Sequence, residues 1–225
     1  MTLWRGSRMA LMILMLLTTV GCVSSMRERD GHMVFNPLFL FYLESPKRDV
    51  WQKPAEVLDA LKIAPGSVVA DIGAGGGYFT EKLANRVGPA GRVYATDVQD
   101  IMLRKLRERV VRQRLTNVTV VRAEYDDPKL PHGACDLAFF SSVYKEIDQR
   151  PAYMSKVGVA LAKGGRVAIL EYRPETDAPG PPRQYRLAES QVIAEMEAAG
   201  FVLLERFDFL PREYFLVFGL LRSAH

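Results

Sequence analysis

Cysteine and histidine are scarce in this chain of 225 residues, which contains two cysteines and three histidines. Their spacings match no metal-ligand pattern, so the sequence predicts no metal site. The sequence also contains no internal repeat, and its N-terminal apolar run at 9–20 is too short to span a bilayer comfortably. The remaining composition, with 48% apolar residues, suits one domain with a full core.

The most informative segment runs from Val68 to Thr80, where an apolar β-type run leads into glycines and then into a helical pattern. Gly73, Gly75 and Gly77 permit a tight turn and let a ligand approach bare backbone beside the free N–H groups of a helix N-terminus. This pattern predicts a nucleotide or nucleoside site. A dinucleotide fingerprint lacks its third glycine here, because Tyr78 stands at that position.

Acidic residues follow three β-type runs in this part of the chain. Asp71 ends the first run, Asp97 ends the second, and Glu124 and Asp126 follow the third. Several carboxylates would repel a pyrophosphate but would suit a ribose diol with a cationic group, as in S-adenosylmethionine (SAM). Two other interpretations stay open: Asp97 as a helix N-cap, and Glu124 and Asp126 as solvated loop acids.

From about Trp51 to about Arg222 the chain resembles the class I SAM-dependent methyltransferases, with the nearest likeness to the small-molecule branch that includes quinone-biosynthesis enzymes. The glycine turn is similar to the first motif of that family, Asp97 to its ribose-binding acid, and 124–125 to its adenine contact. The segment 161–167 resembles the turn into the fifth strand, and 199–218 the terminal antiparallel pair. The cofactor-binding residues implied by the resemblance are Asp71, Gly73, Ala74, Gly75, Gly77, Asp97, Val98, Glu124, Tyr125 and Ser141.

The resemblance implies an α/β, Rossmann-like fold: a mainly parallel seven-stranded sheet with helices on both faces and a C-terminal antiparallel strand pair. The residue patterns predict alternating strands and helices. Strands are expected at 68–72, 92–97, 118–123, 135–142, 166–172, 201–209 and 214–221. Helices are expected at 54–62, 77–87, 100–114, 149–162 and 189–199.

Methyl transfer from SAM to a small, apolar acceptor is the activity that the resemblance implies. An oxygen or nitrogen acceptor would also need a base, for which Tyr144, Glu146 and His132 are candidates. Related enzymes often have a histidine near position 145, where this chain has Lys145. Ordinary helix-start polarity also explains Tyr144 and Glu146, so the catalytic residues stay open. A SAM-binding lipoprotein without catalysis and an RNA methyltransferase are the alternatives.

The N-terminus resembles a bacterial lipoprotein signal. Arg5 and Arg8 precede the apolar run, which ends in small residues before Cys22. We expect a signal peptide at 1–21, lipidation of Cys22 and a protein anchored to the membrane of the cell envelope, although a leucine is missing at position 19. A signal anchor that is not cleaved, or a later start giving a cytoplasmic protein, are the alternatives.

A tether with an apolar lid is expected at 22–50, before a methyltransferase domain at 51–225. The segment 33–43 is strongly apolar, which suits either a lid over the cofactor or a patch resting on a membrane. The Pro-rich segment 174–182 is either a substrate-side loop or an inert linker.

Removing 1–21, which holds Arg5, Arg8 and no acid, lowers the net charge from +4 to +2. Basic residues are frequent in 104–114, but such a run is more typical of a solvated helix face, so no nucleic-acid partner is expected. The sequence predicts no particular oligomeric state.

Overall fold

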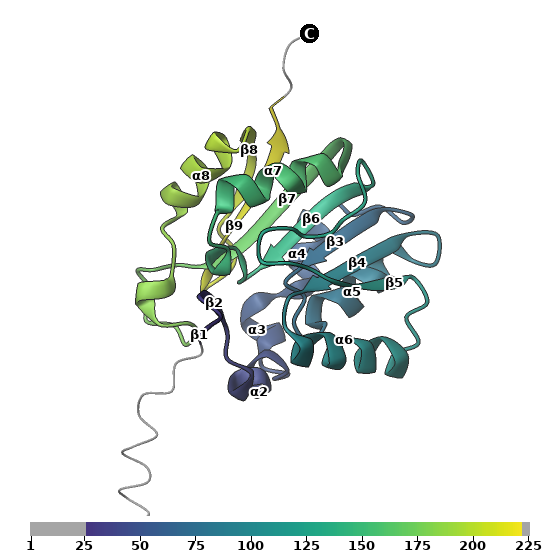
Figure 1. Cartoon of the computed structure of the whole chain (residues 1–225), viewed down its shortest axis with the longest axis horizontal. Helices are drawn as coiled ribbons and strands as arrows, with labels where there is room; N and C mark the ends of the chain where they lie inside the picture. The colour runs from purple at the N-terminus through teal and green to yellow at the C-terminus, as the bar shows by residue number, and fades with distance from the viewer. Residues whose placement is uncertain (1–25, 222–225) are drawn as a thin grey trace, which may run out of the picture.

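A single seven-stranded sheet organises the computed structural model, which describes residues 26–221 (Figure 1). The strand order is β5-β4-β3-β6-β7-β9-β8, and only β9 runs antiparallel to its neighbours β7 and β8. The predicted architecture is therefore confirmed. The strands are β3 (Val68–Ile72), β4 (Arg92–Asp97), β5 (Val118–Arg122), β6 (Cys135–Ser141), β7 (Leu161–Tyr172), β8 (Phe201–Phe207) and β9 (Glu213–Leu220).

Helices cover both faces of the sheet because its central strands are apolar on both faces. Along β6, Leu137 and Phe139 pack with residues of α4 and α5, whereas Ala138 and Phe140 pack with residues of α7 and α8. Successive side chains of a strand point to opposite faces, so a continuous apolar run is buried twice. The helices are α4 (Pro54–Ala60), α5 (Tyr78–Val87), α6 (Asp100–Arg112), α7 (Arg150–Ala160) and α8 (Glu189–Ala198).

One strand begins earlier than predicted. β7 starts at Leu161, which pairs with Cys135, and its regular pairing with β6 resumes only at Arg166. The residues between them form an irregularity in which Gly164 has a positive φ of 83°. The pair Gly164-Gly165 therefore forms an irregularity within β7, whereas the sequence predicted a turn that ends before the strand begins.

The N-terminal segment contains structure that the sequence analysis did not predict. Two short antiparallel strands form a hairpin around Asp30 and Gly31, which have φ values of 53° and 82°. Asp-Gly is a favoured hairpin turn because both positions tolerate a positive φ. The elements before α4 are β1 (Met26–Arg29), β2 (His32–Phe35), η1 (Pro37–Phe39), α2 (Leu40–Leu43) and α3 (Arg48–Gln52).

The predicted signal peptide and Cys22 lie outside the described residues. Within residues 26–221, none of the helices combines the length and apolar character needed to cross a bilayer.

Candidate functional site

The turn after β3 adopts the backbone conformation that its glycines permit. Gly73, Gly75 and Gly77 have φ values of 65°, 55° and 87°, in the left-handed region that favours glycine. The N–H of Ala74 donates to the backbone oxygen of Thr96 at 2.9 Å, which ties the turn to β4. The turn therefore carries its backbone across the carboxyl ends of two neighbouring strands before α5 begins.

Asp97 closes this turn from the end of β4. Its carboxylate accepts hydrogen bonds from the N–H of Gly75 at 2.9 Å and from the N–H of Gln99 at 2.8 Å. The residue is 8% exposed, and burial raises the pKa of its carboxyl to about 6. Asp71, at the end of β3, accepts from the Thr80 hydroxyl at 2.6 Å, and burial raises its pKa to about 6 as well.

A cavity of about 550 Å³ lies at this carboxyl edge of the sheet, within the size range of small-ligand pockets. Its floor is the glycine turn with Asp97, and its remaining walls come from the N-terminal segment, the loop after β6 and the loop after β7. Of the predicted cofactor-binding residues, those that line it are Asp71, Gly73, Ala74, Gly75, Asp97, Val98, Glu124, Tyr125 and Ser141.

Gly77 is the predicted cofactor residue that does not line the cavity. It precedes α5 as its N-cap, and a Cβ at this position would lie 2.7 Å from a methyl of Leu106. Its missing side chain therefore serves close packing against α6 rather than ligand access.

Two buried polar atoms in the cavity wall have no hydrogen-bond partner among the described residues: Thr96 Oγ1 and Gln99 Oε1. Buried polar atoms are normally satisfied, so unpaired ones at a cavity indicate a ligand or water. Together with Asp97, these oxygens fit a ligand that carries hydroxyl donors, such as a nucleoside. Gln99 was not among the predicted cofactor-binding residues. Its position, two residues after Asp97 at the end of β4, was the signal that could have identified it.

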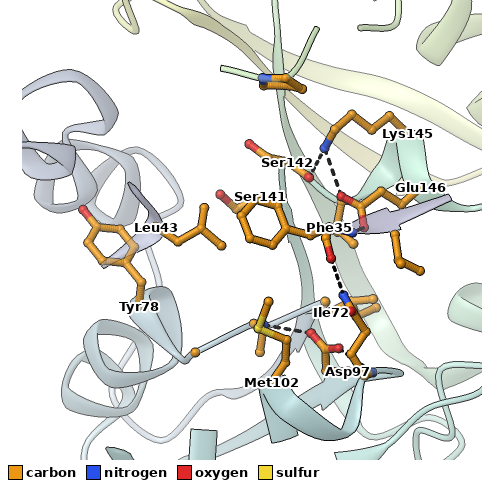
Figure 2. Close-up of a pocket in the computed structure, with 18 of the residues that line it drawn as sticks. Phe35, Leu43, Ile72, Tyr78, Asp97, Met102, Ser141, Ser142, Lys145 and Glu146 are labelled. Atoms are coloured by element: carbon orange, nitrogen blue, oxygen red, sulfur yellow. Dashed lines mark hydrogen bonds and ion pairs between the residues drawn. The ribbon is translucent and has the colours of Figure 1, made fainter. Parts of the chain in front are cut away.

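The hairpin contacts two walls of the cavity through the backbone of one residue, Phe35. The N–H of Phe35 donates to Glu146 Oε2 at 3.2 Å, and the carbonyl of Phe35 accepts from Gln99 Nε2 at 3.2 Å (Figure 2). β2 thus bridges the loop after β6 and the loop after β4. The segment 33–43, predicted to be a lid or a membrane patch, contributes Met33, Val34, Phe35, Phe39, Phe41, Tyr42 and Leu43 to the cavity wall.

A further acidic residue that lines the cavity is Glu146, in the short helix η2 (Tyr144–Glu146). Burial raises the pKa of Glu146 to about 7; Lys145 opposes this rise and Glu171 adds to it. Lys145 Nζ lies 3.5 Å from Glu146 and 3.8 Å from Glu171, and it donates to the carbonyl of Ser142. A carboxyl with a pKa near neutrality can accept a proton from a ligand at physiological pH.

The other two predicted base candidates lie away from the cavity. Tyr144 is fully buried in the core, where its ring packs against Phe140 at a centroid distance of 6.2 Å. His132 is exposed in the loop before β6, at the amino edge of the sheet. The seven residues of β6 separate it from the cavity by about 20 Å. Neither residue can contact a ligand held in this cavity.

Glu213 forms a buried polar network beside the cavity. Gln52 Nε2 donates to both of its carboxylate oxygens at 3.0 Å, and the Ser142 hydroxyl donates to it at 2.9 Å. Ser142 has a φ of 60°, which is uncommon for a residue other than glycine. The network joins α3, the end of β6 and β9, so elements distant in sequence meet at one wall of the site.

Alanine substitutions at Gly73, Gly75 and Gly133, which all have a positive φ, are expected to separate packing from ligand access. Gly73→Ala would place a Cβ 2.2 Å from Val143 Cγ2, and we expect it to lower the free energy of unfolding by about 2 kcal/mol or more. Gly75→Ala meets no protein atom within 4 Å, so it should cost about 1–2 kcal/mol of stability while its methyl blocks the cavity. Gly133→Ala, outside the cavity, is the matched control for the backbone cost. Urea unfolding measures the stability of the variants, and titration with SAM measures ligand binding. An unchanged affinity for SAM in Gly75→Ala would contradict the prediction.

Glu213 is expected to make the stability of the protein depend on pH. The unfolded chain releases the Glu213 proton at a lower pH than the folded protein does, and between these two pH values stability should decrease as the pH rises. Burial raises the pKa of Glu213 from 4.5 to about 7, a difference worth roughly 3 kcal/mol. The unfolded state then binds fewer protons between these pH values, so the free energy of unfolding falls as pH rises.

Glu213→Gln should remove part of this slope, whereas Asp71, Asp97 and Glu146 retain the rest. Urea unfolding at pH 5 and pH 8 measures it, with Glu205→Gln on β8 as control. Equal pH slopes in wild type and Glu213→Gln would contradict the assignment.

Comparison with known proteins shows which proteins have a similar sequence and a similar fold. Residues 69–165 match a family profile described as a methyltransferase domain. A SAM-dependent methyltransferase from Aquifex aeolicus superposes with a TM-score of 0.79 and 26% identity, covering 82% of this chain and 98% of that one. The chain has the Rossmann-like methyltransferase fold.

Two further proteins are similar to this chain, one in sequence and one in fold. The ubiquinone/menaquinone biosynthesis C-methyltransferase UbiE of Ectopseudomonas mendocina is 27% identical over 147 residues, which cover 65% of this chain and 56% of UbiE. The chain thus spans about half the length of the curated relatives it matches. The O-methyltransferase NcsB1 from neocarzinostatin biosynthesis, solved with S-adenosyl-L-homocysteine and 1,4-dihydroxy-2-naphthoic acid, shares the fold with a TM-score of 0.64 and 18% identity, covering 80% of this chain and 57% of NcsB1.

Proposed function

We propose that this protein is a SAM-dependent methyltransferase with a small, apolar acceptor. The observation that carries the proposal is one cavity that joins two chemically different parts. One part holds the glycine turn, Asp97 and the unpaired oxygens of Thr96 and Gln99. The other is walled by aromatic side chains. A methyl donor and an apolar acceptor therefore find matching surroundings within one enclosure.

In the polar part, Asp97 and Gln99 would bind the ribose hydroxyls of SAM, and the positive N-terminal end of α5, which follows the glycine turn, would attract its carboxylate. Glu124 and Tyr125, after β5, would face the adenine end. SAM supplies a methyl group already activated by the sulfonium. The protein's part is to align the acceptor and exclude water, which can contribute about 7–11 kcal/mol to rate acceleration.

The aromatic part favours a flat, apolar acceptor. Trp51 packs against Tyr42 and Tyr172 with centroid distances of 6.1 and 5.8 Å, and all three rings line the cavity. UbiE is named for quinone biosynthesis and NcsB1 was solved with a dihydroxynaphthoic acid. These relatives support an aromatic, hydroxylated acceptor class. Glu146 is the base that would accept its proton.

The test is to incubate the purified full chain with methyl-labelled SAM and a panel of hydroxylated aromatic compounds, or a bacterial lipid extract, and to follow the label. Transfer to an extractable apolar product supports the proposal. Label in added RNA would favour the RNA methyltransferase instead. Tight SAM binding without any transfer would favour the SAM-binding protein without catalysis.

We also propose that 33–43 acts as a lid and that 174–182 is its partner wall. The Tyr42 hydroxyl donates to the carbonyl of Pro179 at 2.9 Å, and the Tyr42 hydroxyl in turn accepts a hydrogen bond from Arg212 at 3.2 Å. Tyr42→Phe removes these two bonds and the 3.4 Å contact with the Tyr172 hydroxyl. At about 1 kcal/mol for each bond, we expect SAM to dissociate at least several times faster. Stopped-flow fluorescence measures this rate. Tyr94→Phe, outside the cavity, is the control, and equal dissociation rates in both variants would count against the lid.

For the N-terminus we propose cleavage before Cys22 and lipidation of its thiol, with the domain held at the cell envelope. Arg5, Arg8 and the apolar run support this. Labelling of cells with a fatty-acid analogue tests it: wild type should carry the label and Cys22→Ser should not. A protein that retains Met1 and stays in the cytosolic fraction would refute the proposal.

A further inference from the structure

The segment that covers the cavity is apolar on its outer side as well as on its inner side. Leu38 and Phe41 are 74% and 72% exposed, and Val50, on α3, is 78% exposed. Phe41 also lines the cavity, so apolar surface continues from the outside of the protein to the interior of the site. Large apolar side chains exposed together at the rim of a cavity indicate an interaction surface.

The helix α6, next to this segment, carries positive charge that the protein itself does not neutralise. Arg109 links the two elements, because its guanidinium bonds Glu44 at the end of α2 and Glu81 on α5. On the outer face of α6, Arg104, Arg107 and Arg112 are exposed and have no acidic partner among the described residues. Both elements lie along the lower edge of the molecule in Figure 1.

The described chain also begins at this place. Met26, the first residue of β1, lines the same cavity as Phe41. The residues before it include Cys22, for which lipidation is proposed above. A lipid on Cys22 would therefore be attached four residues before a side chain that lines the cavity.

We propose that the outer sides of η1, α2 and α6 form one docking surface for an anionic lipid bilayer. Exposed Leu and Phe side chains suit the acyl boundary of a bilayer, and the unpaired arginines suit its anionic headgroups. This goes beyond the proposed methyl transfer, because it concerns the orientation of the protein on a membrane. It also gives the cavity an orientation: the rim at Phe41 opens towards the lipid, so an apolar ligand enters without crossing water.

The experiment uses the full chain with Cys22→Ser, so that a single introduced cysteine can be labelled with an environment-sensitive dye. Cys135 is fully buried and does not compete. The dye is placed at Leu38→Cys or, as a control, at Val159→Cys on α7, a residue that is 54% exposed. Vesicles of phosphatidylcholine with three-tenths phosphatidylglycerol are then added. We expect a severalfold rise in emission at position 38 and none at position 159.

A charge test with matched net charge accompanies this measurement. Arg104→Gln with Arg107→Gln should reduce the emission gain at position 38 by about half or more, since each basic residue near an anionic surface contributes to attraction. Lys62→Gln with Lys163→Gln removes the same charge at the amino edge of the sheet and should leave the gain unchanged. Salt at 0.5 M should act like the arginine pair.

Three outcomes would overturn the proposal. If the protein sediments with vesicles while the dye at position 38 does not respond, only the N-terminal segment binds lipid. An equal response at positions 38 and 159 would mean that the protein associates without a defined face. A response at position 38 to single-stranded RNA but not to vesicles would assign the surface to nucleic acid. None of these readouts depends on methyl transfer.

Discussion

Glu146→Gln is expected to reduce the rate of methyl transfer about 100- to 10,000-fold, the usual contribution of a general base. The variant keeps an oxygen that can accept from the N–H of Phe35, so the hairpin contact should survive. SAM affinity should therefore stay close to that of the wild type. Glu205→Gln, the same change on β8 outside the cavity, should leave the rate unaffected. The measurement is the turnover of the acceptor found with labelled SAM.

The pH dependence provides an independent check on this role. Burial raises the pKa of Glu146 to about 7, and a base must be deprotonated to act. The rate of the wild type should therefore rise between about pH 6 and pH 8 and then level off. In Glu146→Gln this rise should disappear. A variant that keeps both the wild-type rate and its pH profile would exclude Glu146 as the base.

Asp97→Ala is expected to weaken SAM binding by about 1.5–3 kcal/mol, the range for hydrogen bonds to a charged group, which corresponds to about 10- to 150-fold in the dissociation constant. The carboxylate holds the N–H groups of Gly75 and Gln99, so its loss also loosens the turn itself. Calorimetric titration with SAM measures the effect. Asp126→Ala, an exposed acid after β5, is the control. Unchanged affinity in Asp97→Ala would reject the ribose assignment.

The sheet and the glycine turn could be predicted because their signals are local. Each central strand is an apolar run of the right length, and the glycines of the turn stand directly between β3 and α5. The order of elements then fixes which strand ends meet, since parallel strands joined by helices share one carboxyl edge. Asp71 and Asp97 were found in this way. The hairpin was missed although Asp30-Gly31 is a recognised turn signal.

The acid network could not be predicted because its members are brought together only by the fold. Glu213 meets Gln52 across 161 positions of sequence, and Glu146 meets Phe35 across 111. Tyr144 and Glu146 differ by two positions, and only the geometry of η2 decides which of them faces the cavity. His132 is a different case. Its position before β6 already placed it at the amino edge of the sheet, away from any ligand at the carboxyl edge.

The position of β9 in the sheet has a consequence for how the protein is made. β9 lies between β7 and β8, so β8 has no partner until the ribosome has produced the residues that follow it. Until then the edge of β7 is open, and open apolar edges of nascent chains are prone to aggregation. Glu213, which fixes Gln52 of α3, arrives with the same strand. The wall of the cavity that α3 forms is therefore among the last parts to be secured, and co-translational folding has to wait for the final strand.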